Sequence, residues 1–336
     1  MYKTILDTAQ TEIAIDKFKN FFQKELAKKL KTQRITAPMF VKAGTGINDD
    51  LNGIEKPVSF KIKNMNDTPV EIVQSLAKWK RIQLKKLKIP AHQGIYTDMN
   101  AIRPDDEIDQ LHSIYVDQWD WEIVIMPQDR TISFLKKTVR KIYHVLQKSE
   151  KFIHQKYPDI TPILPAHITF ITSEELEKKY PGLTPKQREN QICQQHKAVF
   201  IIGIGYPLQN GLPHDGRAPD YDDWSTATKL GHGLNGDLLI WSPLLKQAVE
   251  LSSMGIRVDK KALATQLALR HNEERQKLFF HQLLLSNQLP LSIGGGIGQS
   301  RLCMFFLRKI HIGEVQASIW PESMLKKCQK ENIFLL

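Results

Sequence analysis

The sequence contains very little cysteine, which limits the chemistry open to it. Its 336 residues include only Cys193, Cys303 and Cys328. No two of these have the spacing of a zinc knuckle or of a redox pair, and so few cysteines are typical of a reducing compartment. Cys303 lies in an apolar segment, which favours a core position over a nucleophile. We therefore expect neither a zinc site nor a catalytic thiol.

Long apolar runs are also absent. Residues 1–7 lack the apolar centre of a signal peptide. The longest apolar stretch, residues 198–206, is too short to cross a bilayer. These two observations predict a cytoplasmic protein with no membrane partner.

Two common nucleotide-binding motifs are missing. No glycine-rich segment has the GxxxxGK[ST] spacing of a P-loop, and none has GxGxxG followed about 20 residues later by an acidic residue. A nucleotide would therefore need a different kind of site.

The charge is unbalanced but spread along the chain. Hydrophobic residues make up 41% and charged residues 25%, as in globular proteins, and 47 Lys and Arg against 36 Asp and Glu give a net charge of +11. Such a charge can indicate a polyanionic partner. Here the lysines lie on segments that resemble solvated helix faces, while aromatic residues gather with aspartates. We therefore expect no nucleic-acid partner.

Residues 292–304 form the most unusual stretch. Four glycines interrupt an apolar strand, and Arg301 follows them before a buried helix at 302–307; the glycines are Gly294, Gly295, Gly296 and Gly298. Glycines allow a flat ligand to lie against the main chain, and an arginine beside them can stack on a base or bind a phosphate. A close crossing of strand and helix would explain the glycines alone. The added arginine favours a nucleotide.

A second feature is a predicted hairpin. One strand, 94–103, ends at Arg103 because Pro104 stops it. In the return strand, 112–122, alternation puts Tyr115, Asp117, Trp119 and Trp121 on one face and Ile114, Val116, Gln118, Asp120 and Glu122 on the other. An exposed edge strand and a substrate pocket both explain the polar face.

Residues 214–226 carry the densest charge. They include four aspartates, Asp215, Asp220, Asp222 and Asp223, interleaved with Tyr221 and Trp224. An exposed acidic loop is the simpler explanation, but the aromatic residues favour a partly buried one. Further along, Glu250, Ser252 and Arg257 could share one face, and a carboxylate with a hydroxyl is a natural magnesium ligand set. Turn chemistry alone explains the glycine-flanked loop at 42–53.

Apolar periodicity predicts the scaffold. We expect helices at 11–31, 71–84 and 131–157, with a helical excursion at about 172–197. Strands are expected at 58–63, 162–171, 198–205 and 236–241.

Taken together, these segments resemble the ammonia-dependent asparagine synthetase (aspartate–ammonia ligase) family. The strings that carry the resemblance are residues 75–81, 115–122, 217–226, 250–258 and 294–302. The resemblance implies an α+β fold, a mostly antiparallel sheet flanked by helices, with the catalytic core of the class II aminoacyl-tRNA synthetases. It also implies a single catalytic domain over residues 1–336 and a homodimer.

The resemblance also implies a site. Arg103 would bind the α-phosphate of ATP, and Arg301 would lie on the adenine side. The implied nucleotide-binding set is Arg103, Asp237, Glu250, Ser252, Ser253, Arg257, Gly296, Gly298 and Arg301, with Glu250 and Asp237 as ligands of Mg²⁺. The implied aspartate-binding set is Asp49, Ser75, Lys80, Gln118, Asp120, Asp222 and Asp223. Gln74 stands where the family pattern has a histidine.

The implied activity is an ATP-dependent ligation of L-aspartate and ammonia that releases AMP and pyrophosphate. A β-aspartyl adenylate would form first, and Asp49, Arg103 and Arg301 would be the catalytic residues. We hypothesise that Asp49 accepts the proton of ammonium. A relative that loads an amino acid onto RNA would need an anticodon-binding barrel of roughly 100 residues, for which the chain is too short.

Overall fold

A computed structural model describes residues 2–49, 51 and 55–336. The α-helices are α1 (Thr8–Leu30), α2 (Ala77–Lys86), α3 (Ile132–Lys156), α4 (Ser173–Lys179), α5 (Pro185–His196), α6 (Lys260–Leu269), α7 (Phe279–Leu285), α8 (Gln299–Phe306) and α9 (Glu322–Lys330). Short 3₁₀ helices are η1 (Lys63–Met65), η2 (Pro127–Asp129), η3 (Glu273–Lys277) and η4 (Ile312–Glu314). Part of the predicted loop at 42–53 lies outside the described residues.

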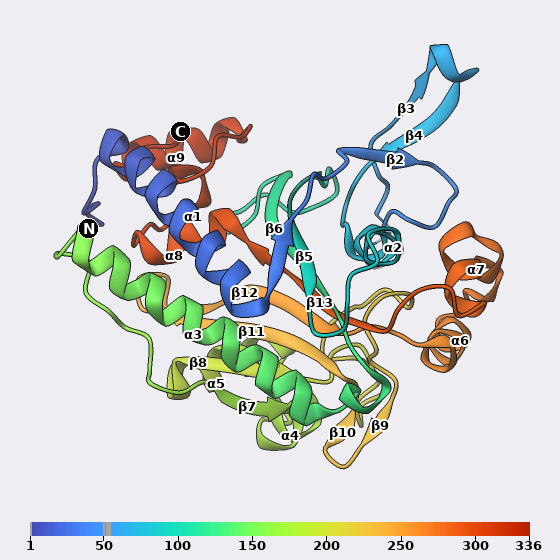
Figure 1. Ribbon diagram of the computed structural model, residues 1–336. Coiled ribbons are helices and arrows are strands. Elements are labelled where there is room, and N and C mark those ends of the chain that lie inside the picture. Colours follow the sequence, from blue (N-terminus) through green and yellow to red (C-terminus); the bar gives the residue numbers. More distant parts are fainter. Residues whose placement is uncertain (1, 50, 52–54) are drawn as a thin grey trace.

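Among the described residues, the strands form three sheets (Figure 1). The large sheet has eight strands in the order β1 (Thr32–Arg34), β5 (Gly94–Ile102), β6 (Tyr115–Val124), β13 (Ser292–Gly298), β12 (Gln247–Ile256), β11 (Asn235–Ser242), β8 (Ala198–Ile202) and β7 (Thr169–Thr172). The three-stranded sheet has the order β2 (Phe40–Lys42), β4 (Thr68–Ile72) and β3 (Ser59–Ile62), and the pair is β9 (Ala227–Thr228) with β10 (Gly231–His232).

The large sheet is antiparallel except at its two edges, where β1 pairs with β5 and β7 with β8 in parallel. The predicted α+β class with a mostly antiparallel sheet is confirmed. Strand β6 lies inside the sheet between β5 and β13. The explanation of its polar face as an exposed edge is therefore wrong.

Opposite faces of the sheet carry different layers. On one face Trp119 of β6 meets Phe22 of α1, with 4.7 Å between ring centroids, and Phe18 of α1 meets Phe306 of α8. Helix α3 packs beside α1 on this face (Figure 1). On the other face α2 packs against β6 and β13. We call these the core face and the site face.

Several predicted boundaries shift. Helix α1 begins at Thr8 because Asp7 and Gln10 form a capping box before it. The predicted helix from Glu71 is wrong in its first part, since the β-prone residues up to Ile72 pair with β2 and β3, and α2 begins only at Ala77. The expected strand at 162–171 is limited to β7, because Pro162 and Pro165 have no N–H to donate.

The helical excursion at 172–197 consists of two helices. Both α4 and α5 begin at threonine capping boxes, at Thr172 and Thr184, and Pro181 and Gly182 lie between them. Within the described residues, no helix combines the length and the apolar character needed to span a membrane.

Candidate active site

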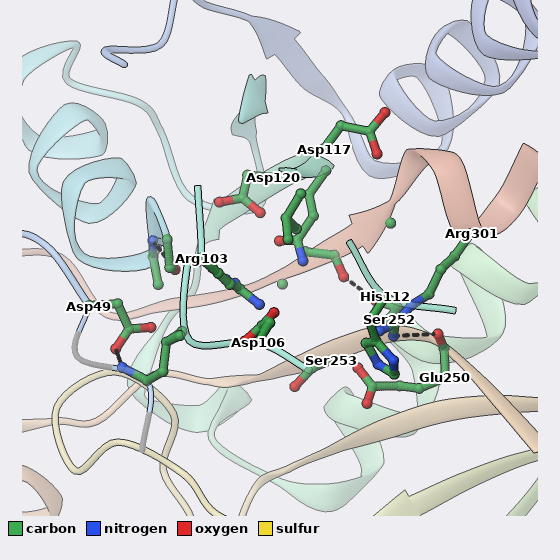
Figure 2. A pocket seen from close by; sticks show the side chains of 18 of the residues that line it. Asp49, Arg103, Asp106, His112, Asp117, Asp120, Glu250, Ser252, Ser253 and Arg301 are labelled. Atoms are coloured by element: carbon green, nitrogen blue, oxygen red, sulfur yellow. Dashed lines mark hydrogen bonds between the residues drawn. The ribbon is translucent and has the colours of Figure 1, made fainter. Parts of the chain in front are cut away.

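A cavity of about 490 Å³ opens on the site face above β13. It gathers most of the side chains that the sequence predicted for the site, although they come from positions between 49 and 301. The predicted residues that line it are Asp49, Ser75, Lys80, Arg103, Gln118, Asp120, Asp222, Glu250, Ser252, Ser253, Arg257, Gly296, Gly298 and Arg301. Figure 2 shows Asp49 at one end of the cavity and Arg301 with Glu250 at the other.

Three glycines of β13, Gly295, Gly296 and Gly298, form the cavity floor. Gly294 lies opposite Glu122, Gly296 opposite Asp120 and Gly298 opposite Gln118 on β6. A Cβ at Gly294 would overlap the Glu122 carboxylate, and one at Gly296 would overlap the Gln118 amide. These two glycines therefore make room for polar side chains of the neighbouring strand.

Gly298 differs from the other floor glycines. A Cβ there would meet only the Arg301 side chain, at 3.4 Å or more. No atom of the described residues lies closer than these to the added Cβ, so the bare backbone at Gly298 leaves room for a ligand.

Two arginines reach the cavity from different elements. Arg103 follows β5, and its Nη2 donates to Gln74 O at 2.9 Å. Arg301 lies in the first turn of α8, and its Nη1 donates to Glu250 O at 3.0 Å. A guanidinium has five N–H donors, so both side chains keep donors for an anion.

A β-bulge arranges the acidic end of the cavity. Ser252 pairs with Leu238 but Glu250 pairs with Leu239, which leaves Leu251 as an extra residue. The bulge puts Glu250 and Ser253 on the same face, whereas strict alternation would put them on opposite faces. Ser252 Oγ donates to Gly296 O at 2.8 Å and so joins this strand to the floor.

Asp237 lies behind the cavity wall and does not line it. Both of its carboxylate oxygens accept from Arg217 Nη2. Burial raises the pKa of Asp237 to about 7; Arg217 opposes this shift and nearby Glu250 adds to it. Asp237 thus meets the cavity through Arg217, which lines it, and a role of Asp237 at the nucleotide or metal stays a prediction.

The opposite end of the cavity is a buried ionic network. Lys80 Nζ lies 3.3 Å from Asp120 Oδ2 and 4.0 Å from Glu122 Oε2, and it donates to Gly295 O at 3.3 Å. Arg257 donates to Glu122 and to Asp222. Burial lowers the pKa of Lys80 although Asp120 and Glu122 oppose it, and burial raises that of Asp222 although Arg257 opposes it.

The last two predicted residues lie in adjacent loops. Asp49 is buried and lines the cavity, and its Oδ1 accepts from Leu51 N at 3.1 Å. Asp223 turns away from the cavity, because its Oδ2 accepts from Arg130 Nη2 and from Thr226 Oγ1. Asp223 therefore organises its own loop.

Sequence reasoning missed several lining residues. Arg217 and Tyr221 come from the acidic stretch, and Asp106, Glu107 and His112 from the turn after Arg103. Glu122, which bonds to Arg257 without lining the cavity itself, was also left out of the predicted site, although it continues the alternation of Gln118 and Asp120. That alternation was the available signal for Glu122, while nothing in the sequence relates Arg217 to Asp237.

The architecture is similar to that of solved class II synthetases. The asparaginyl-tRNA synthetase from Pyrococcus horikoshii, complexed with asparaginyl-adenylate, matches with a TM-score of 0.69 and 14% identity over 93% of this chain and 70% of that chain. The asparaginyl-tRNA synthetase of Entamoeba histolytica matches with a TM-score of 0.63 and 15% identity over 92% and 67%. The chain thus has the class II aminoacyl-tRNA synthetase-like core.

Sequence comparison then identifies the family. The family model described as aspartate–ammonia ligase (AsnA) matches residues 9–332. Aspartate–ammonia ligases of Bacteroides thetaiotaomicron and Clostridium perfringens are 58% and 56% identical, over 100% of this chain and 97% of each relative. The chain belongs to the aspartate–ammonia ligase family, and it is an enzyme of the ligase class.

Proposed function

We propose that this enzyme makes L-asparagine from L-aspartate and ammonia, with ATP cleaved to AMP and pyrophosphate. The observation that carries the proposal is the cavity itself, which combines two arginines from different elements with a glycine floor and a buried ionic network. Such a cavity suits a nucleotide lying beside a small zwitterion.

We propose that the nucleotide lies over Gly296 and Gly298, with Arg103 at the α-phosphate and Arg301 against the base. This assignment is supported by the open space above Gly298 and by the unused N–H groups of both guanidinium groups. Ser252 and Ser253 line the same cavity as the two arginines and would face the ribose and phosphates.

The residues fit a magnesium ion that is held mainly by phosphates. No group of three or more His, Cys, Asp or Glu side chains is placed to hold a metal among the residues that the structure describes. Glu250 lines the cavity and could supply a carboxylate, while Asp237 is held by Arg217. Magnesium is commonly bound by one or two carboxylates plus substrate phosphates, and it neutralises phosphate charge when bound.

We propose that L-aspartate binds in the ionic network. Lys80, Asp120, Glu122, Arg257 and Asp222 together carry two positive and three negative charges. The α-ammonium group of aspartate would balance the excess negative charge beside Asp120 and Asp222, with Gln118 as a further acceptor. Lys80 would meet a carboxylate of the substrate, and Ser75 lies close enough to line the same space.

In the first step, a β-carboxylate oxygen of aspartate attacks the α-phosphorus of ATP. A carboxyl oxygen–phosphorus bond forms, and the bond from the α-phosphorus to the bridging oxygen breaks, so that pyrophosphate leaves and a β-aspartyl adenylate remains. Negative charge builds on the α-phosphate. Arg103 is already held by Gln74 O and can stabilise this charge without rearranging.

In the second step, ammonia attacks the β-carbonyl carbon and AMP leaves with the shared oxygen. Ammonium has no lone pair, so a base must first take a proton. We propose Asp49 for this role because it is a buried carboxylate that lines the same cavity as Ser75 and Lys80. We also propose that the subunit has a single domain and that two subunits form a homodimer in the cytoplasm. Light scattering would test the dimer.

The decisive experiment follows an isotope. Aspartate labelled with ¹⁸O in its β-carboxylate is incubated with ATP, Mg²⁺ and ammonium, and the products are analysed by mass spectrometry. We expect one labelled oxygen in AMP and pyrophosphate release that depends on aspartate. Label in inorganic phosphate with formation of ADP would overturn the proposal, because attack would then be at the γ-phosphorus.

A further inference from the structure

A buried cluster of ionic side chains lies beside the cavity without lining it. Asp220 Oδ2 accepts from Lys78 Nζ at 3.0 Å and from His281 Nε2 at 3.0 Å, and it lies 3.1 Å from Arg275 Nη2. The exposed fractions are 0% for Asp220 and His281, 1% for Lys78 and 8% for Arg275. We call these four residues the Asp220 cluster.

Asp220 is the ionised carboxylate of this cluster. Burial alone would raise the pKa of Asp220, but Lys78, His281 and Arg275 together hold it well below its usual range. Removing the charge from a buried pair leaves the partner charge uncompensated, which costs a protein far more than the loss of a surface pair. The four residues therefore join their backbone segments strongly.

One of these segments is helix α2. Lys78 and Lys80 are two residues apart, so their side chains point about 200° apart around the helix axis. Lys78 meets Asp220, and Lys80 meets Asp120 at the cavity. The direction of Lys80 thus depends on a helix that is fixed from both sides.

A second segment is the loop that contains Asp220. Its next two residues are Tyr221 and Asp222, and both line the cavity. Fixing Asp220 therefore fixes the start of the backbone that places Asp222 beside Arg257.

A third connection runs to the loop of Asp49. A Cβ at Gly46 would lie 2.9 Å from His281 Nδ1, and Gly46 has a φ of +70°, which favours glycine. Phe280 N donates to Thr45 O at 3.1 Å. Helix α7 therefore supports the backbone three residues before Asp49, and Figure 1 shows α7 on the same side of the molecule as α2.

We propose that Asp220 is a positioning residue for the amino-acid half of the active site. It holds Lys80, Asp222 and Asp49 in one arrangement through its bonds to Lys78, Arg275 and His281. The nucleotide half is attached mainly elsewhere, since Arg301 lies on α8 and Arg103 follows β5, and Arg103 approaches α2 only through its bond to Gln74 O. The inference rests on the proposed function, because it assigns these three residues to the amino-acid substrate.

The test is the variant Asp220→Asn in the full chain. We expect kcat/KM for aspartate to fall about 10²-fold, as small displacements of substrate-holding groups produce. The affinity for ATP, measured by calorimetry without turnover, should change by less than about twofold. The bonds that the variant removes join Asp220 to none of the residues assigned to the nucleotide. An unchanged kcat/KM for aspartate, or an equal loss of ATP binding, would overturn the proposal.

A matched control is Glu150→Gln on the core face. Glu150 is also a buried carboxylate paired with an arginine, since it lies 3.4 Å from Arg308 Nη2 and accepts from Ile163 N at 2.7 Å. We expect it to lower Tm comparably while leaving kcat/KM for aspartate unchanged. An equal loss in both variants would mean that Asp220 acts only on stability.

A second variant tests the proposal if Asp220→Asn does not fold. Lys78→Met keeps two partners of Asp220, namely Arg275 and His281. We expect a smaller loss of kcat/KM for aspartate, again with little change in ATP binding. Equal losses for aspartate and ATP would also overturn the proposal.

The wild-type enzyme is assayed first. A wild type that forms no asparagine refutes the proposed function, whereas an active wild type without selective variants refutes only the role of Asp220.

Discussion

The two faces of strand β6 are equally buried but chemically opposite. Trp121 and Glu122 are neighbours in the sequence and both are 0% exposed. Trp121 lies in the apolar core, while Glu122 bonds to Arg257 and Ser292. Burial of an aromatic side chain stabilises a fold directly, but a buried charge is tolerated only when it is paired. The site face thus contributes less to stability than the core face. This arrangement is expected for a face that binds charged substrates.

The largest expected difference between the two faces comes from removing both arginines of the site face, Arg103 and Arg301. We expect Arg103→Ala with Arg301→Ala to reduce kcat by about 10⁴-fold or more, since loss of one such donor typically costs about 10²–10³-fold. Single-turnover pyrophosphate release measures the effect, and Tm should change little because both side chains are partly exposed. Retention of wild-type turnover would contradict the assignment.

The converse change is Trp119→Ala on the core face. Trp119 is almost fully buried against Phe22, so truncation should lower the free energy of unfolding by about 3–5 kcal/mol. Urea unfolding measures the loss. In the folded fraction, KM for ATP and aspartate should stay as in the wild type, and a change in either would show that the faces are coupled.

Substitutions at two glycines of the cavity floor allow a comparison within the site face. Gly296→Ala forces the Gln118 amide and Asp120 to move, which should cost about 1–3 kcal/mol of stability and weaken aspartate binding. Gly298→Ala meets only Arg301, so stability should hold while KM for ATP rises. Thermal unfolding and steady-state kinetics of both variants give the comparison. Equal behaviour of the two would contradict an open ligand surface at Gly298.

The smallest expected effect is a pH dependence of stability that the site face contributes. The pKa of Asp237 is raised from 3.8 to about 7, so the folded protein keeps a proton that the unfolded chain releases. This group therefore reduces stability as the pH rises from about 4 to about 7. Asp237→Asn removes that contribution, so the Tm of the variant minus that of the wild type should increase as the pH rises from about 4 to about 7. A constant Tm difference would contradict the raised pKa.

Local patterns predicted much of this arrangement. The alternation of residues 115–122 gave both faces of β6 correctly, with Gln118 and Asp120 at the cavity and Trp119 in the core. Pro104 marked the end of the strand before Arg103, and the interleaved Tyr221 and Trp224 indicated a buried loop, as found for Asp220 and Asp222. Each of these signals depends on neighbours within a few residues.

Local patterns could not predict contacts between distant segments. Asp223 bonds to Arg130, 93 residues earlier in the chain, and Asp237 bonds to Arg217. No pattern near either aspartate indicates these partners, and their predicted roles at the substrate and metal stay predictions. The bulge at Leu251 arises from pairing with β11, and no local sequence pattern in β12 predicts it. The helix predicted from Glu71 failed because β4 finds partners in β2 and β3.

The position of β13 has a consequence for biogenesis. This strand lies at the centre of the large sheet, between β6 and β12, yet it is the last of the sheet's described strands to be synthesised. Until residue 298 leaves the ribosome, β6 and β12 have unpaired inner edges, and such edges invite association with other chains. Truncation before Ser292 should therefore yield two half-sheets prone to aggregation, and enzyme activity should appear only after the last central strand has inserted.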